Sequence, residues 1–355
     1  MTHQLTIEPL GVALDVAPGQ TLLDAALRHG IYLPHACGHG LCGTCKVQVL
    51  AGEVDHGPAN PFALMDVERD EGKTLACCAT ALSDVVIEAD VDEDPDAEVI
   101  PLRDVTATVA RAEMLTPTIR GLWLRLDEPL PFQAGQYVQV HVPGVEGTRA
   151  FSIANSPQEV QATGLLELNV RRVPGGAATT WLHERLAPGD RLRLSGPNGR
   201  FFVRRSAGKP LIFLAGGSGL SSPRSMILDL LATGWSQPIT LVYGQRTRDE
   251  LYYHEEFVAL ARRHPHFHFV PCLSHEPDGS GWDGARCFVH EVAKAHFGGQ
   301  FAGHQAYLCG PPPMIEACLA TLMQGRLFER DIHTERFLTA ADAASASRSP
   351  LFHRI

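Results

Sequence analysis

Four cysteines have a spacing that suits an iron–sulfur cluster. Cys37, Cys42 and Cys45 stand in the run CGHGLCGTC, and Cys77 follows further along the chain. The pattern C-x4-C-x2-C with a distant fourth cysteine is typical of a 2Fe-2S cluster held by thiolates. A structural zinc site usually has two short cysteine pairs, and the second pair is missing because Cys77 and Cys78 are adjacent. The spacing therefore predicts single-electron chemistry at these cysteines.

The fourth ligand and two nearby histidines leave alternatives open. We assign the fourth ligand to Cys77, which ends a Leu-Ala-Cys run, with Cys78 as the alternative. His35 and His39 flank Cys37 and have the chemistry of Rieske-type ligands. Four cysteines already complete the site, so we expect both histidines to face solvent or to form hydrogen bonds.

Composition bounds the remaining possibilities. With 355 residues and 38.5 kDa, the chain is long enough for two or three domains. A net charge of -10 argues against a nucleic-acid partner, which would need its phosphates neutralised. The sequence shows no apolar run of membrane-spanning length and no secretory signal, so we expect no membrane partner and a cytoplasmic location.

The elements that must position the cysteines follow from the residue pattern of the first segment. Residues 5–16 alternate apolar and polar side chains around a turn and predict a hairpin. Thr21 is suited to cap a helix over residues 21–29, with Asp24 at the third helical position of a capping box. Residues 90–98 are acidic and contain proline, which indicates a linker. We therefore expect a first domain at residues 1–95.

The residue pattern of the rest of the chain changes once, near residue 208. Short alternating segments between residues 105 and 203 predict an antiparallel β-barrel, and we place that domain at residues 96–206. Beyond residue 208, apolar runs alternate with amphipathic stretches of helical length, which predicts a parallel sheet with helical crossovers at residues 207–340. Residues 341–355 form a tail. The fold class is thus multidomain, α+β followed by α/β.

The barrel segment carries the run Arg149-Ala-Phe-Ser-Ile-Ala-Asn155, which resembles the flavin signature of ferredoxin-NADP reductase-type flavoproteins. The resemblance implies that this flavin motif (residues 149–155) binds FAD. Arg149 would offset phosphate charge, Phe151 would pack on the flavin, Ser152 would bond to the ring edge, and Asn155 completes the signature. Tyrosine is commoner than phenylalanine at position 151 in that family.

A second flavin element is expected at residues 175–180. Gly175, Gly176 and Thr179 stand where small residues and a helix start can bring backbone amides to a pyrophosphate. An ordinary turn would have the same composition, so the order of the two elements along the chain carries the assignment.

The third segment has two glycine-containing motifs that suit a dinucleotide. Gly216, Gly217 and Gly219 follow an apolar strand and open a helix, so a diphosphate can approach the helix start. The run from Tyr307 to Met314 resembles the nicotinamide motif of the same family; it contains Gly310 and Pro311 and would put Cys309 beside the hydride path.

The residues expected to contact the adenosine ribose do not decide between NADH and NADPH. Arg246 and Arg248 favour a 2′-phosphate and NADPH, whereas Asp249 and Glu250 favour NADH. The family resemblance favours NADH. Phe337 lies where related reductases place an aromatic ring over the flavin, so it is either a movable catalytic shield or a core residue.

The order of ferredoxin, flavin barrel and nucleotide domain resembles the reductase components of bacterial multicomponent oxygenases, and four short segments resemble those of phenol hydroxylases. The resemblance implies a β-grasp ferredoxin domain and electron transfer from NADH to FAD, to the 2Fe-2S cluster, and to a separate di-iron hydroxylase. FAD is needed because hydride carries two electrons and the cluster accepts one.

Two other functions remain open at this point. A reductase of the same architecture could serve a Rieske-type dioxygenase or another aromatic or alkene monooxygenase. A non-catalytic electron carrier or redox sensor would use the cluster alone, but it would leave both nucleotide motifs without a purpose.

Overall fold

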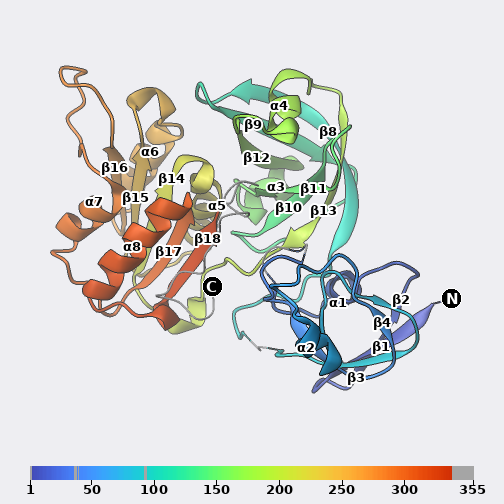
Figure 1. Ribbon diagram of the computed structural model, residues 1–355. Coiled ribbons are helices and arrows are strands. Elements are labelled where there is room, and N and C mark those ends of the chain that lie inside the picture. The colour runs from blue at the N-terminus through green and yellow to red at the C-terminus, as the bar shows by residue number, and fades with distance from the viewer. Residues whose placement is uncertain (1, 36–37, 39, 92–93, 338–355) are drawn as a thin grey trace. The chain divides into compact units, whose positions relative to one another are not determined.

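The computed structural model describes residues 2–35, 38, 40–91 and 94–337. The chain divides into two compact units, Met1–Arg103 and Asp104–Ile355 (Figure 1). Within the described residues, no helix has the length and apolar character that crossing a membrane requires.

The first unit is a five-stranded mixed sheet in the order β2-β1-β7-β3-β5. The predicted hairpin forms β1 and β2, and β1 pairs in parallel with β7, as the resemblance to a β-grasp ferredoxin implies. A two-stranded sheet joins β4 to β6. The elements are β1 (His3–Glu8), β2 (Val12–Val16), α1 (Leu22–Arg28), β3 (Lys46–Ala51), β4 (Val54–Asp55), α2 (Asp66–Asp70), β5 (Lys73–Leu75), β6 (Thr80–Ala81) and β7 (Val85–Glu88).

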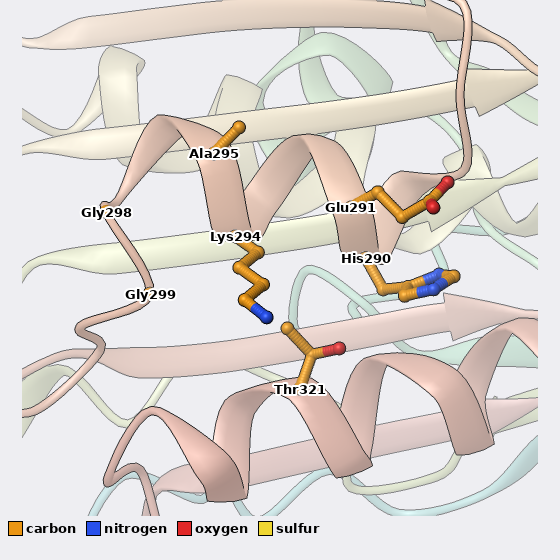
Figure 2. A pocket seen from close by; sticks show the side chains of 7 residues that line it. All are labelled: His290, Glu291, Lys294, Ala295, Gly298, Gly299 and Thr321. Atoms are coloured by element: carbon orange, nitrogen blue, oxygen red, sulfur yellow. The ribbon is translucent and has the colours of Figure 1, made fainter.

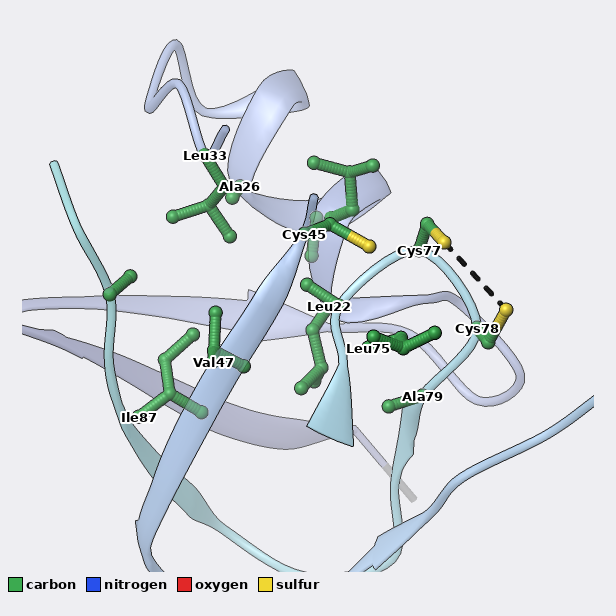
Figure 3. Close-up of a cluster of buried hydrophobic side chains, with 14 of the residues drawn as sticks. Leu22, Ala26, Leu33, Cys45, Val47, Leu75, Cys77, Cys78, Ala79 and Ile87 are labelled. Atoms are coloured by element: carbon green, nitrogen blue, oxygen red, sulfur yellow. Dashed lines mark hydrogen bonds between the residues drawn. The ribbon is translucent and has the colours of Figure 1, made fainter. Parts of the chain in front are cut away.

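The predicted helix start is half correct. The Thr21 side chain accepts a hydrogen bond from the Asp24 backbone N–H at 3.2 Å, as an N-cap should. The Asp24 carboxylate accepts instead from Gln20 and Arg28, at 2.7 and 2.8 Å. Leu22 and Ala26 bury their side chains in the core of this unit, beside strand residues of the sheet (Figure 3).

The second unit begins with an antiparallel barrel in the order β11-β10-β13-β8-β9-β12. Its two edge strands meet through a bridge between Ile153 and Leu168, which closes the sheet. The barrel consists of β8 (Arg103–Met114), β9 (Ile119–Leu126), β10 (Tyr137–His141), β11 (Thr148–Ser152), α3 (Pro157–Thr163), β12 (Leu165–Arg171), α4 (Ala177–Glu184) and β13 (Arg191–Asn198).

The remainder of this unit, the nucleotide domain, is a parallel sheet in the order β16-β15-β14-β17-β18. Alternate residues of β14 face opposite ways: Phe213 packs with α5 and α6, whereas Leu214 packs with α7 and α8. The elements are η1 (Arg205–Ala207), β14 (Leu211–Gly216), η2 (Gly217–Leu220), α5 (Ser221–Ala232), β15 (Ile239–Gln245), η3 (Arg248–Glu250), α6 (His254–Arg263), β16 (Phe267–Leu273), α7 (Val289–His296), β17 (Gln305–Gly310), α8 (Pro312–Gln324), η4 (Glu329–Asp331) and β18 (Ile332–Arg336).

Strand β18 was not predicted. It pairs in parallel with β17, which places Glu335 opposite Cys309. The strand order reverses between β14 and β17, and the carboxyl ends of strands at such a reversal are the usual place for a ligand in open α/β sheets.

Candidate functional site

Three of the four predicted cluster ligands, Cys42, Cys45 and Cys77, lie in described parts of the first unit. Cys45 directly precedes β3, and Cys77 lies two residues beyond β5. The Ala76 backbone N–H donates to the Cys45 carbonyl at 2.9 Å, so the neighbouring strands bring these two cysteines close in space. Figure 3 shows the sulfur atoms of Cys45, Cys77 and Cys78 beside the apolar core. Cys42 is half-buried on the preceding loop.

Gly40, in the ligand loop (residues 37–45), lies close to the second cysteine segment, Cys77 and Cys78. Gly40 has a φ of +80°, and a Cβ there would lie 2.6 Å from the Cys78 sulfur. The Cys78 sulfur therefore borders the loop, and it lies 3.7 Å from the Cys77 sulfur. The choice of Cys77 over Cys78 stays a prediction.

The donor set of these cysteines suits a 2Fe-2S cluster, because thiolates bind iron–sulfur clusters. The predicted ligand Cys37 and the neighbouring His39 lie outside the described residues. In the part of the chain that is described, no group of three or more ligating side chains gathers around one point to hold a metal ion. The assignment of the cluster ligands is therefore supported by the type and spacing of the cysteines and by the backbone hydrogen bond between Ala76 and Cys45.

The flavin motif runs along β11. Arg149 is exposed and donates to the carbonyls of Glu146 and Thr148, at 3.2 and 2.8 Å. Phe151 is half-buried and packs against the barrel core. The Arg149 guanidinium thus stays accessible to an anion at the barrel surface.

Asn155 at the end of the motif bonds to the neighbouring strand. Its amide nitrogen donates to the Leu165 carbonyl at 2.8 Å, and its amide oxygen accepts from the Glu167 backbone N–H at 3.0 Å. The side chain is buried. These bonds give Asn155 a positioning role for β12, and direct contact with FAD stays a prediction.

The second flavin element is a turn that opens α4. Gly175 has a φ of +72°, Gly176 precedes the helix, and Thr179 accepts from the Val173 backbone N–H at 3.1 Å. The start of α4 therefore offers backbone N–H groups of the kind that suit a pyrophosphate. At the other end, the Arg120 guanidinium binds three carbonyls, those of Leu182, His183 and Leu186, at 2.7, 2.9 and 3.0 Å.

The two nucleotide motifs touch at the strand-order reversal. Gly216 ends β14, and Gly217 has a φ of +61°. A Cβ on Gly219 would lie 2.4 Å from the Cys309 carbonyl oxygen, so the two turns are in backbone contact. Gly310 follows Cys309 and accepts from the Phe337 backbone N–H at 3.1 Å.

Three of the predicted contacts lie at the rim of this region. Arg246 is exposed just after β15, Pro311 caps α8, and Phe337 packs partly buried on the core of the nucleotide domain. The sequence analysis missed Arg171, an exposed residue at the end of β12. A Cβ on Gly217 would meet its guanidinium nitrogen at 2.8 Å, so the barrel provides a cation beside the nucleotide turn.

A carboxylate that was not predicted joins the flavin motif to the nicotinamide motif. Glu335 Oε2 accepts from Ser152 Oγ at 3.2 Å, from Ser222 Oγ at 2.6 Å and from Cys309 Sγ at 3.4 Å. We call these four residues the Glu335 set. The signal in the sequence was Glu335 itself, two residues before Phe337, but nothing there indicated its strand partner.

The protonation of this set follows from its surroundings. Burial raises the pKa of Cys309 well above its ordinary value, and the Glu335 carboxylate raises it further. The thiol is therefore neutral near pH 7 and acts as a hydrogen-bond donor. Burial also raises the pKa of Glu335, while hydrogen bonds from Ser222, Cys309 and Ser152 act in the opposite direction.

A shallow pocket elsewhere in the nucleotide domain has no part in these motifs. It lies between α7 and α8 and is lined by seven residues, three of which are His290, Lys294 and Thr321 (Figure 2). It shares no residue with the flavin or nicotinamide motifs, so we assign it no role.

Three family models match successive parts of the chain. A 2Fe-2S iron-sulfur cluster binding domain matches residues 5–82, an oxidoreductase FAD-binding domain matches residues 106–203, and an oxidoreductase NAD-binding domain matches residues 213–319. The cofactors of the chain are accordingly a 2Fe-2S cluster, FAD and NADH.

Characterised relatives match along the whole length. The reductase component DmpP of phenol 2-monooxygenase from Pseudomonas sp. (strain CF600) is 60% identical, and the phenol hydroxylase P5 protein from Acinetobacter pittii (strain PHEA-2) is 58% identical, with 100% of each chain covered.

Solved structures agree with this likeness. The cytochrome P450 reductase GcoB from Amycolatopsis superposes with a TM-score of 0.85 at 40% identity, over 95% of this chain and 99% of that one. The ferredoxin reductase of carbazole 1,9a-dioxygenase superposes with a TM-score of 0.77 at 30% identity, with the same coverage. Taken with the ligand cysteines, the flavin motif and the nucleotide motifs, these matches place the chain in the family of iron–sulfur flavoprotein reductase components of multicomponent oxygenases, alongside those of the phenol hydroxylases.

Proposed function

We propose that this chain oxidises NADH and passes the electrons through FAD and the 2Fe-2S cluster to a separate di-iron hydroxylase that acts on phenol. FAD supplies the step from paired to single electrons. The observation that carries the proposal is the Glu335 set, in which Ser152 of the flavin motif and Cys309 of the nicotinamide motif bond to one carboxylate.

The residues of the chain have separate tasks in this proposal. Ser152 would bond to the flavin ring edge, and Cys309 would lie beside the nicotinamide. Arg149 and the start of α4 bind the flavin phosphates, while the turn at Gly216–Leu220 and Arg171 bind the dinucleotide. Arg246 would contact the ribose, and Phe337 would shield the flavin ring.

Family kinship supports a separate protein partner. A separate oxygenase component is implied by relatives that are named as reductase components of monooxygenases. The di-iron type of that partner, its phenol substrate and a cytoplasmic location are our proposals.

The first test is anaerobic reduction followed by electron delivery. The purified chain, assayed for flavin and iron, is titrated with NADH and then with NADPH while its absorbance is recorded. We expect NADH to bleach both flavin and cluster and NADPH to bleach little. The reduced chain is then mixed with a purified di-iron phenol hydroxylase and, separately, with a Rieske-type dioxygenase. Product from the dioxygenase alone would contradict the proposed partner, and a cluster that NADH does not reduce would contradict the electron path.

A further inference from the structure

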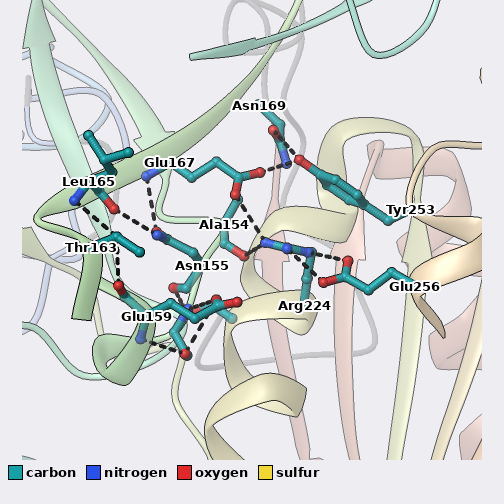
Figure 4. Close-up of polar contacts among 12 residues, drawn as sticks. Ala154, Asn155, Glu159, Thr163, Leu165, Glu167, Asn169, Arg224, Tyr253 and Glu256 are labelled. Atoms are coloured by element: carbon teal, nitrogen blue, oxygen red, sulfur yellow. Dashed lines mark hydrogen bonds and ion pairs between the residues drawn. The ribbon is translucent and has the colours of Figure 1, made fainter. Parts of the chain in front are cut away.

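A buried guanidinium joins the barrel to the nucleotide domain. Arg224 lies on α5, and its side chain is 7% exposed. Its Nε and Nη2 donate to the carboxylate of Glu256 at 2.7 and 2.8 Å. Its Nη1 donates to the Ala154 carbonyl at 2.8 Å and lies 3.3 Å from Glu167 Oε2 (Figure 4). Arg224 therefore bonds at the same time to its own domain and to two residues of the barrel.

Tyr253 adds an aromatic wall to this cluster. Its φ is +58°, a conformation that non-glycine residues seldom adopt and that the surrounding structure must hold in place. In that conformation the centroid of the Tyr253 ring lies 4.2 Å from Arg224 Cζ, and the Tyr253 hydroxyl donates a hydrogen bond to the Glu167 carboxylate. Burial raises the pKa of Tyr253, and so does Glu167, so the hydroxyl keeps its proton.

The guanidinium keeps its charge as well. Burial acts to lower the pKa of Arg224, but the carboxylates of Glu167 and Glu256 outweigh burial and raise it. The Glu167 side chain is only 5% exposed, so its negative charge is buried where the barrel meets the nucleotide domain. The Arg224 guanidinium balances that charge.

The first turn of α5 reaches both parts of the reaction site. Ser222 Oγ donates to Glu335 at 2.6 Å, while Ser225 Oγ donates to the Asn155 carbonyl at 2.8 Å. Arg224 stands between them and holds Ala154, which is also in the flavin motif. One turn of helix therefore links the end of the flavin motif to the carboxylate that binds Cys309.

We propose that Arg224 is a positioning residue for hydride transfer, which sets the separation between the flavin motif and Cys309 by fixing α5 to the barrel. The inference rests on the proposed function and adds a residue that acts through the elements it joins, by its hydrogen bond to Ala154 of the flavin motif. Reaction rates depend steeply on such separations, since a misplacement of 1 Å from a distant mutation costs about 100-fold.

The test compares Arg224→Met and Arg224→Lys with Arg191→Met. Arg191 also pairs with a carboxylate, Asp127, but on the exposed barrel surface. Each variant is assayed for bound flavin and iron, and the limiting rate of flavin reduction and the NADH dissociation constant are measured by stopped flow. We expect Arg224→Met to lower the limiting rate roughly 10- to 100-fold with an unchanged dissociation constant. Arg224→Lys should recover part of the rate, and Arg191→Met should match the wild type.

A second half-reaction separates positioning from general damage. Each variant is reduced with dithionite, and electron delivery from the cluster to cytochrome c is followed. We expect wild-type delivery in all three variants, because that step bypasses hydride transfer. Flavin reduction at the wild-type rate in Arg224→Met, or a change in the dissociation constant alone, would overturn the inference.

A gentler variant covers the case in which Arg224→Met fails to fold. Glu256→Gln removes one charge of the bidentate pair, and the Glu256 side chain is 29% exposed, so the loss is easier to accommodate. A limiting rate equal to that of the wild type in a flavin-loaded Glu256→Gln chain would then contradict the inference. A wild-type chain that NADH does not reduce would contradict the proposed function instead.

Discussion

The ligand loop and the Glu335 set are two proposed reaction sites built in opposite ways. The loop supplies three cysteines within residues 37–45, and one neighbouring turn supplies the fourth. The Glu335 set draws on four separate elements, and Ser152 and Glu335 are 183 positions apart. A local site is specified by spacing along the chain, whereas a distributed site exists only after strands and helices have packed.

This difference has a chemical counterpart. The predicted cluster ligands are cysteine thiolates, a type of ligand that by itself restricts what a site binds. The members of the Glu335 set are common polar residues, and their meaning comes from burial and from the three hydrogen bonds on one carboxylate oxygen. Substitutions in the two sites should therefore interrupt different halves of the electron path.

The largest effect is expected at the cluster. Cys77→Ser should remove the cluster, and with it all electron delivery to an oxygenase, because a hydroxyl is a poor substitute for a thiolate ligand. Reduction of FAD by NADH should continue at the wild-type rate. Iron analysis and the visible spectrum measure the first effect, and stopped flow measures the second.

Cys78→Ser is the matched control, since Cys78 is the adjacent residue and is equally buried. It should retain two irons in each chain, the number in a 2Fe-2S cluster. Loss of the cluster in Cys78→Ser and its retention in Cys77→Ser would reverse the assignment of the fourth ligand.

The next largest effect is expected in the distributed site. Glu335→Ala removes the acceptor shared by Ser152, Ser222 and Cys309, so both motifs lose a bond that holds them. We expect the limiting rate of flavin reduction to fall roughly 10- to 100-fold, with the cluster intact. Glu255→Ala, at a carboxylate that is 92% exposed, is the control and should have no effect. Equal rates in both variants would show that the set has no part in hydride transfer.

A smaller effect is expected from the cation beside the nucleotide turn. Arg171→Met should weaken NADH binding about fivefold, equivalent to about 1 kcal/mol, and the loss should shrink as salt is added. Arg172→Met is a close control, because Arg172 is adjacent and already pairs with Glu184. NADH dissociation constants at two salt concentrations measure the difference, and equal losses in the two variants would contradict the role of Arg171.

The smallest expected effect is on the pH dependence of stability. The pKa of Glu335 is raised in the folded chain above its ordinary value of 4.5, chiefly by burial. The folded state therefore binds this proton more tightly than the unfolded state, and the stabilisation is complete below pH 4.5 and lost as pH rises through the folded pKa. The thermal midpoint of the wild type, relative to Glu335→Gln, should fall over that range. Parallel midpoints at all pH values would contradict the shift.

The sequence predicted what depends on local pattern. The helix cap at Thr21, the strand alternation of the barrel and the parallel sheet all have short-range signals, and the structure contains each of them. The second hydrogen bond of the predicted capping box, from the Thr21 backbone N–H to the Asp24 carboxylate, does not form. The carboxylate accepts from Gln20 and Arg28 instead.

What escaped prediction depends on packing. Strand β18 has one strongly apolar residue, Ile332, because it is an edge strand with a single neighbour, so its sequence lacks the apolar run of its partners. Glu335, Arg171 and Arg224 gain their roles only from contacts with residues far along the chain. No short-range pattern contains that information.

Strand β18 also sets an order of events during synthesis. Domains generally fold as units while the chain emerges from the ribosome, the N-terminal ones first. The unit Met1–Arg103 can therefore form its sheet while most of the chain is still untranslated. The carboxylate beside Cys309 arrives only with residues 332–336. A newly made chain should thus be able to acquire its iron before it can accept hydride, so the two capacities appear at different times in the life of each molecule.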